Sequence, residues 1–206
     1  MNKILSASIL SISLLLSSCG SAGVPAGESG WARGNIDSKI VLTEYSDFQC
    51  PACKAAEPSV AQIMQEFGDK IRVEYHHFPL PIHKNSEKAA IAAESAGMQK
   101  KFWEMHDALF AGQNDWAELD NPTDVYKKYA KDIGLDVAKF EKDMSSGEAI
   151  GRMNRDKAMA NDLKLDRTPS FLLNGLLLRP SSFDELRTLI QTGIESSKSS
   201  SGTVLK

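Results

Sequence analysis

Apolar residues form two strand-like runs in the first half of the chain, with a helix-like run between them. Residues 39–45 are apolar on both faces, which is typical of a central strand. Residues 71–78 alternate between apolar and polar positions, which predicts a strand with one buried face. Between the two runs, apolar residues recur at helical spacing from residue 50 to residue 67, and Gly68 then ends the helix. The pattern predicts a β–α–β unit.

The second half of the chain changes from helices back to strands. Residues 84–163 show only helical periodicity, so we interpret them as a helical insertion. Two short apolar runs follow at 170–173 and 176–178, and Asn174-Gly175 between them is a strong hairpin signal. A capping box from Ser182 to Glu185 then opens a last helix. The order predicts one α/β domain with a helical block between a β–α–β half and a β–β–α half.

A Cys-x-x-Cys motif, Cys50-Pro51-Ala52-Cys53, lies between the first predicted strand and the first predicted helix. At a helix start, unpaired backbone N–H groups and the helix dipole favour negative charge. Such settings lower the pKa of a cysteine from about 8.5 to roughly 3.5–7.5. We therefore predict that Cys50 is the nucleophile in thiol–disulfide exchange. Cys53, about one turn later, is predicted to resolve the mixed disulfide.

The same motif also occurs as half of a structural zinc site, which needs a second pair of ligands at short spacing. The chain has only three cysteines and four histidines. The third cysteine, Cys19, belongs to the N-terminal segment, and the adjacent His76 and His77 point to opposite faces of the predicted strand. We therefore predict redox chemistry that uses no metal and no other cofactor.

The N-terminal segment has the features of an export signal. Lys3 supplies a positive charge, and the apolar run at 4–16 is too short to span a bilayer as a permanent helix. Leu16-Ser17-Ser18-Cys19 follows, and it resembles the lipobox of bacterial lipoproteins, in which the cysteine is lipidated. An ordinary secretory signal with a chance cysteine is the alternative. Both interpretations place the protein outside the cytosol, in the periplasm or cell envelope, where disulfides persist.

The ends of the mature chain are predicted to be unstructured. After a signal peptide over 1–18, the segment 19–35 is rich in Gly, Ser and Ala and reads as a flexible tether. An ordered arm docked by Trp31 is the alternative. The Ser-rich segment 196–206 is predicted to be a disordered tail. The folded domain is then 36–195.

Composition limits the partners of this domain. The chain has 206 residues, of which 42% are hydrophobic and 25% charged, with a net charge of −3. This length supports one domain with a sizeable core. No basic stripe with interleaved aromatic residues is present, so we expect no nucleic-acid binding. We expect a monomer. We also expect no structural disulfide, because the motif takes both cysteines that remain after Cys19.

Four segments resemble the thiol:disulfide interchange proteins of the DsbA type, over roughly residues 36–195. They are the active-site segment Ser46 to Cys53, the helical segment Phe102 to Phe110, the segment Thr168 to Phe171, and the hairpin turn Asn174-Gly175. The resemblance implies a thioredoxin fold with a helical insertion between its two halves.

The resemblance also implies roles for individual residues. Cys50 and Cys53 match the attacking and resolving cysteines. Pro169 matches the cis-proline that faces the disulfide, and Thr168 before it leaves backbone groups free to pair with a bound peptide. Glu44 matches a buried acid beneath the disulfide, whose raised pKa suits it to move the proton of the resolving cysteine. A partly exposed glutamate at the strand end is the alternative.

Together with the lipobox, the resemblance implies a membrane-tethered oxidase that introduces disulfides into exported cysteine-containing proteins. A DsbB-like, quinone-linked membrane enzyme would reoxidise it. Two other functions stay open: a disulfide reductase or isomerase, and a thioredoxin-like lipoprotein that only binds a partner. Arg167 departs from the family, in which a small residue is usual at this position. Its cation is expected either to stabilise the thiolate, or to favour acidic substrates, or to be inert.

Overall fold

The computed structural model describes residues 30–201, with side chains as far as residue 197. The elements of this part are, in order, β1 (Trp31–Gly34), β2 (Val41–Ser46), α1 (Pro51–Phe67), β3 (Arg72–His77), α2 (Ser86–Gly97), α3 (Phe102–Ala111), α4 (Gln113–Trp116), α5 (Thr123–Asp132), α6 (Val137–Asp143), α7 (Gly147–Asp162), β4 (Ser170–Leu173), β5 (Leu176–Leu177) and α8 (Phe183–Ser201).

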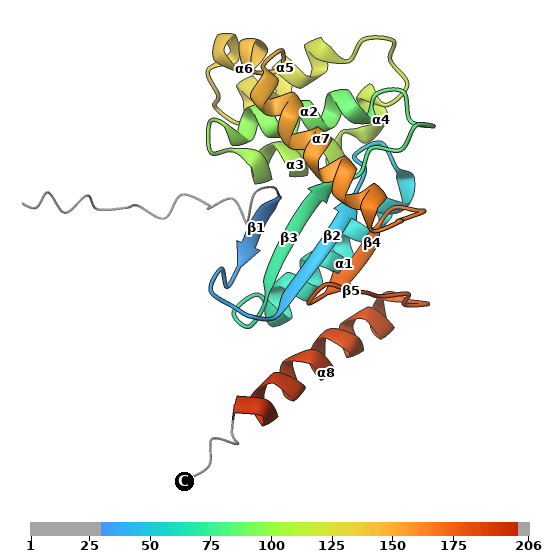
Figure 1. Ribbon diagram of the computed structural model, residues 1–206. Coiled ribbons are helices and arrows are strands. Elements are labelled where there is room, and N and C mark those ends of the chain that lie inside the picture. Colours follow the sequence, from blue (N-terminus) through green and yellow to red (C-terminus); the bar gives the residue numbers. More distant parts are fainter. Residues whose placement is uncertain (1–29, 202–206) are drawn as a thin grey trace, which may run out of the picture.

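One mixed sheet lies at the centre of the fold, with strand order β1-β3-β2-β4-β5 (Figure 1). Strands β2 and β3 are parallel and joined by α1, whereas the other neighbouring pairs are antiparallel. In this register Glu44 of β2 lies between Tyr75 of β3 and Phe171 of β4. The arrowheads of β2 and β3 point toward the helical block in Figure 1. The segment that leaves β2 and carries the cysteines therefore lies between the sheet and that block.

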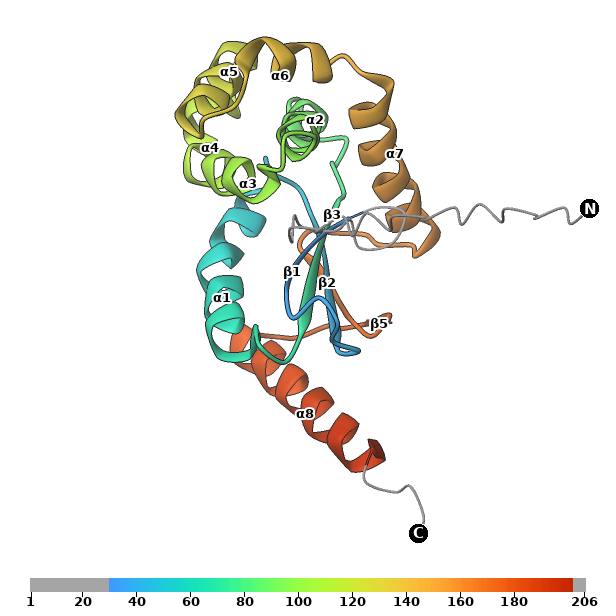
Figure 2. The same cartoon turned by 90° about the vertical axis from the view of Figure 1, so that its left-hand side faces the viewer.

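Helices cover both faces of the sheet, with α1 and α8 on one side and α7 on the other (Figure 2). The sheet, α1 and α8 share one apolar core, in which Leu42, Ile63 and Ile190 are buried. On the opposite face, Tyr45 packs in a smaller cluster that includes Ala160 of α7. Because successive residues of a strand point to opposite faces, β2 contributes to both cores, as its continuous apolar pattern predicts.

The α/β architecture with a helical insertion is confirmed, and so are the signals that define its second half. Asn174 and Gly175 have positive φ angles of 50° and 81°, as a two-residue hairpin turn between β4 and β5 requires. At the start of α8 the Ser182 hydroxyl accepts a hydrogen bond from the Glu185 backbone N–H at 3.2 Å. The Glu185 carboxylate accepts from the N–H of Ser181, one residue before the expected partner.

The predicted tether is wrong in its last part, because residues 31–34 form β1. Trp31 is buried at 8% exposure and stacks on Phe102 with ring centroids 4.7 Å apart. A Cβ atom built on Gly97 of α2 would lie 2.2 Å from the Trp31 ring, so the fit requires a residue without a side chain there. The alternative of an ordered arm docked by Trp31 is therefore confirmed for these residues, because one large aromatic ring is enough to dock a Gly-rich segment. The remainder of the predicted tether, 19–29, lies outside the described residues.

Two further expectations are corrected. The predicted disordered tail is wrong over 196–201, because α8 continues to Ser201. Ile194 is the last buried residue among the α8 side chains that the structure describes. Strand β3 was expected to bury one face, yet Tyr75, His76 and His77 are all buried. Pairing with β1 and coverage by α7 and the helical block enclose the second half of this strand on both sides.

Candidate active site

Cys50 is the N-cap residue of α1, and Cys53 lies in the first turn. Cys50 has extended backbone angles, φ −70° and ψ 121°, so the helix begins one residue later than predicted, at Pro51. Both cysteines are free thiols. The exposed fraction is 7% for Cys50 and 0% for Cys53. Only Cys50 is therefore accessible to another molecule.

The surroundings of the two thiols push their pKa values apart. The Cys53 thiol hydrogen-bonds to the Cys50 sulfur and is the largest cause that lowers the pKa of Cys50, to about 5. The Thr168 side chain and the backbone N–H groups of Cys53 and Ala52 lower it further, against the effect of burial. Burial and the neighbouring Cys50 raise the pKa of Cys53 well above its usual value. At neutral pH, Cys50 is thus a thiolate and Cys53 a thiol, as the placement of the motif predicts.

The loop before β4 lies against the Cys50 sulfur. The peptide bond from Thr168 to Pro169 is cis, as the family resemblance implies. The Cys50 Sγ lies 3.6 Å from the Thr168 carbonyl oxygen, and Thr168 is 7% exposed. The structure therefore brings together Cys50, Cys53, Thr168 and Pro169. Cys50 and Pro169 are 119 residues apart in the sequence (169 − 50).

Glu44 lies buried in the sheet on the active-site side. It is 2% exposed, and its Oε1 atom has no hydrogen-bond partner among the described residues. Burial raises the pKa of its carboxyl group, while the Ser46 side chain and the charge of Arg33 act in the opposite direction. The alternative of a partly exposed glutamate is therefore wrong. Its role in proton transfer stays a prediction.

A second acid near the cysteines, Glu57, is half-buried and was missed by sequence reasoning. It lies on α1 four residues after Cys53, so it points to the same side of the helix. Burial, and then the nearby Glu44, raise its pKa to about 8. Its Oε1 atom lies 3.8 Å from Nε2 of His106, a fully buried histidine whose pKa burial lowers to about 4. His106 is therefore neutral, as expected for a core histidine.

Asp47, three residues before Cys50, makes extensive contacts that the sequence did not predict. Its carboxylate accepts hydrogen bonds from the N–H groups of Gln49 and Leu80, at 2.8 and 2.9 Å. His83 Nδ1 lies 2.7 Å from the same oxygen that Leu80 contacts. The backbone N–H of Asp47 points to the Cys53 Sγ at 3.5 Å. This side chain joins the cysteine segment to the loop that follows β3.

Arg167 pairs with its neighbour in the sequence. Its guanidinium contacts the carboxylate of Asp166 at 3.1 and 3.2 Å. No hydrogen bond or ion pair joins Arg167 to Cys50 among the described residues, so the three expectations for this cation stay predictions. Cys19, the predicted lipidation site, lies outside the described residues.

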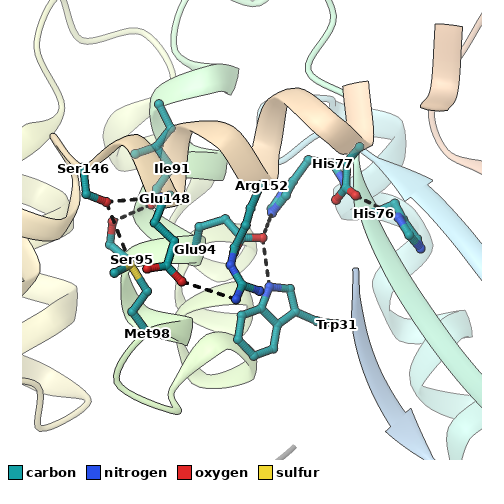
Figure 3. Close-up of polar contacts among 12 residues, drawn as sticks. Trp31, His76, His77, Ile91, Glu94, Ser95, Met98, Ser146, Glu148 and Arg152 are labelled. Carbon is teal, nitrogen blue, oxygen red and sulfur yellow. Dashed lines mark hydrogen bonds and ion pairs between the residues drawn. The ribbon is translucent and has the colours of Figure 1, made fainter. Parts of the chain in front are cut away.

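The described residues also hold a cluster with metal-binding side chains, formed by His77, Glu94 and Asp156. Figure 3 shows how His77 and Glu94 lie beside Trp31 and Arg152. Each carboxylate already accepts hydrogen bonds: Glu94 from the Trp31 indole at 2.9 Å, and Asp156 from the backbone N–H of His77, also at 2.9 Å. His76, whose pKa its acidic neighbours raise to about 9 despite burial, supplies a positive charge beside Asp156. We interpret the cluster as a polar network that joins β1, β3, α2 and α7.

A protein-family model matches most of the chain. A model described as thioredoxin matches residues 27–192. The chain belongs to the thioredoxin family. Its fold is that of the DsbA-type thiol:disulfide oxidoreductases, as the sequence predicts. BdbD from Bacillus subtilis superimposes with a TM-score of 0.72 at 20% identity, over 84% of this chain and 97% of that chain. For alpha-DsbA1 from Wolbachia pipientis the TM-score is 0.73 at 18% identity, over 86% and 96%.

The curated relatives are much longer proteins. One is Na(+)/H(+) antiporter NhaA 1 from Mycolicibacterium vanbaalenii, which is 36% identical over 149 residues. The match covers 70% of this chain but 23% of the antiporter, so this chain spans about a quarter of the length of that relative. Among residues 30–201, no helix is both long and apolar enough to cross a membrane.

Proposed function

We propose that this protein is a thiol:disulfide oxidoreductase, and that it oxidises pairs of thiols in exported client proteins. One observation carries the proposal: a stabilised thiolate at Cys50, on the N-cap of α1, with the buried thiol of Cys53 behind it. Stabilising this thiolate favours the reduced form of the protein over the disulfide. The Cys50–Cys53 disulfide is then a strong acceptor of electrons from client thiols.

The reaction needs two exchanges. A client thiolate attacks the Cys50 Sγ, which forms a bond between the client sulfur and Cys50 and breaks the Cys50–Cys53 bond. Cys53 leaves as a thiolate and takes up a proton, as its raised pKa favours. The second client thiolate then attacks the client sulfur of the mixed disulfide and releases Cys50 as a thiolate. The client loses two electrons and gains a disulfide, while the protein becomes a dithiol.

Glu44 is our candidate for the proton donor to Cys53. Its raised pKa leaves its carboxyl group protonated at a pH at which an exposed glutamate is ionised. It lies in the strand that leads directly into the cysteine segment, and it is buried as Cys53 is. We propose that Glu44 is the acid that protonates Cys53 as it leaves, and the base for it during reoxidation.

The client segment is proposed to lie along Thr168 and Pro169. The Thr168 carbonyl oxygen already lies near the Cys50 Sγ, so an extended client backbone there would bring its cysteine to the exposed sulfur. Such backbone pairing is independent of the client sequence. It suits an enzyme that acts on many partly folded polypeptides.

Export and membrane attachment are part of the proposal. Lipidation of Cys19 would hold the domain at a membrane, where a quinone-linked enzyme could reoxidise the dithiol. A Cys19→Ser variant cannot carry this lipid, so it should leave the membrane fraction. An unmodified mature chain in the intact mass of the wild type would contradict this anchoring.

Equilibration of the protein with reduced and oxidised glutathione tests the direction of the reaction. We expect a midpoint well on the oxidising side, with fast oxidation of a reduced model client and none by Cys50→Ser. A reducing midpoint together with rapid reduction of insulin would instead support the reductase or isomerase. No exchange in either direction would support a protein that only binds a partner.

A further inference from the structure

A surface cavity of about 360 Å³ lies beside the active site. Pro169 forms part of its wall, and the preceding Thr168 contacts the Cys50 sulfur. The apolar part of the lining consists of Pro169, Phe171, Leu178, Pro180, Phe183 and Leu186. A cavity of this size and character accepts one large apolar side chain, with the polypeptide on either side of it at the rim.

The charged residues that line this cavity are Arg167 and Arg179. Both contact the same oxygen of Asp166 at 3.1 Å, from Arg167 Nε and Arg179 Nη1. Asp166 itself is not part of the lining. The nearby carboxylate of Glu185 accepts hydrogen bonds from the N–H and the hydroxyl of Ser181. Two cations therefore share one carboxylate at the edge of an apolar cavity.

These ion pairs are exposed, so they are easily rearranged. The exposed fraction of the side chain is 68% for Arg167, 49% for Arg179 and 55% for Asp166. Exposed ion pairs contribute little to stability. Because the two guanidinium groups share the single carboxylate of Asp166, a carboxylate of a bound molecule can pair with them as well. Charges at the rim of a binding site chiefly affect the association rate and its dependence on salt.

We propose that this rim selects client segments that carry an apolar side chain and a neighbouring carboxylate close to the reacting cysteine. The apolar side chain enters the cavity, and the carboxylate pairs with Arg167 and Arg179. The inference rests on the proposed oxidoreductase function and assigns that site a preferred class of substrate.

Two peptides test the preference. Each carries two cysteines and a leucine, and they differ only in a glutamate or a lysine beside the first cysteine. With wild-type disulfide protein, we expect oxidation of the glutamate peptide to be about 2- to 5-fold faster at low salt, as one exposed ion pair allows. This ratio should approach one at high salt, because exposed charges are screened.

Charge variants give the sharpest controls. The double variant Arg167→Gln with Arg179→Gln should lower the ratio to about one, whereas Asp166→Asn should raise it above the wild-type value. Lys128→Gln removes one positive charge from α5, in the helical block away from β4, and should leave the ratio unchanged. A merely structural role of these residues would not move the ratio in opposite directions. An equal rate for both peptides in the wild type, or an unchanged ratio in the double variant, would overturn the inference.

A binding experiment distinguishes a failure of this inference from a failure of the proposed function. Peptides with serine in place of cysteine cannot exchange, and their binding is followed by NMR shifts of the protein. If neither cysteine peptide is oxidised, the proposed function fails, and the serine peptides still decide the inference. Tighter binding of the glutamate peptide then supports the rim as a selective surface, and equal binding refutes it.

Discussion

The backbone N–H of Asp47 lies 3.5 Å from the Sγ of Cys53, and the same residue binds the loop after β3 through its carboxylate. The side chain is fully buried, and its two oxygens accept from Gln49 and Leu80 and contact His83. One residue thus fixes both the position of the buried sulfur and the loop that borders it. Asp47 is a positioning residue.

Replacement of Asp47 should therefore affect stability and Cys53 together. Asp47→Ala leaves buried N–H groups unpaired, which should lower the free energy of unfolding by about 1–3 kcal/mol in urea titrations. Asp47→Asn keeps one acceptor oxygen and should lose less. Because the Asp47 N–H helps to lower the pKa of Cys53, a displaced N–H should slow release of glutathione from a Cys50 mixed disulfide. Equal release rates in Asp47→Ala and the wild type would show that the residue only supports the fold.

The low pKa of Cys50 should be visible in the pH dependence of its reactivity. Alkylation of the reduced protein, followed by peptide mapping, should show a Cys50 rate that rises with a midpoint near pH 5. Cys53 should remain protected throughout this range because it is buried and its pKa is raised. Preferential labelling of Cys53 would contradict the assignment of the nucleophile.

The same shift has a consequence for stability. The folded-state pKa of Cys50 lies below the value of about 8.5 for an unfolded thiol, so the unfolded chain binds more protons between these values. The stability of the reduced form should therefore rise with pH from about 5 toward 8.5, relative to Cys50→Ser. The contribution should be lost as pH falls through about 5. Urea unfolding of both proteins under a phosphine reductant measures this difference.

The sequence predicts the fold and the two reacting cysteines because those features are local. Strand periods, the Asn174-Gly175 turn and the strand–motif–helix order all lie within short windows. Glu57 had a usable signal as well, since four residues after Cys53 is one helical turn. The role of Asp47 had none, because it depends on Leu80, 33 residues away. Docking of Trp31 was only an alternative from the sequence, because its partner Glu94 on α2 lies 63 residues away.

Glu57 should make stability depend on pH in the opposite direction from Cys50. Its folded-state pKa of about 8 lies above the unfolded value of about 4.3, so the folded protein binds more protons between these values. Stability should therefore fall as pH rises across this range. Glu57→Gln removes this loss, so the variant should gain on the wild type between pH 5 and pH 8 in urea titrations. Glu66→Gln on the same helix is the control, because Arg187 lowers the pKa of Glu66. A constant difference between Glu57→Gln and the wild type would refute the raised pKa.

Replacement of Cys53 should trap the mixed disulfide between Cys50 and a client protein. In Cys53→Ala, Cys50 keeps its thiolate-stabilising backbone N–H groups from Ala52 and residue 53 but has no internal thiol to displace a bound client. Disulfides between Cys50 and client cysteines should therefore accumulate in cells, and reduction should release cysteine-containing exported proteins. Loss of the Cys53 thiol also removes the largest cause of the low pKa of Cys50, so that pKa should rise. Cys50→Ala is the matched control, because it removes the exposed sulfur and leaves only the buried one. If Cys53→Ala traps no more adducts than Cys50→Ala, exchange through the exposed sulfur is wrong, and a role in binding alone becomes the better explanation.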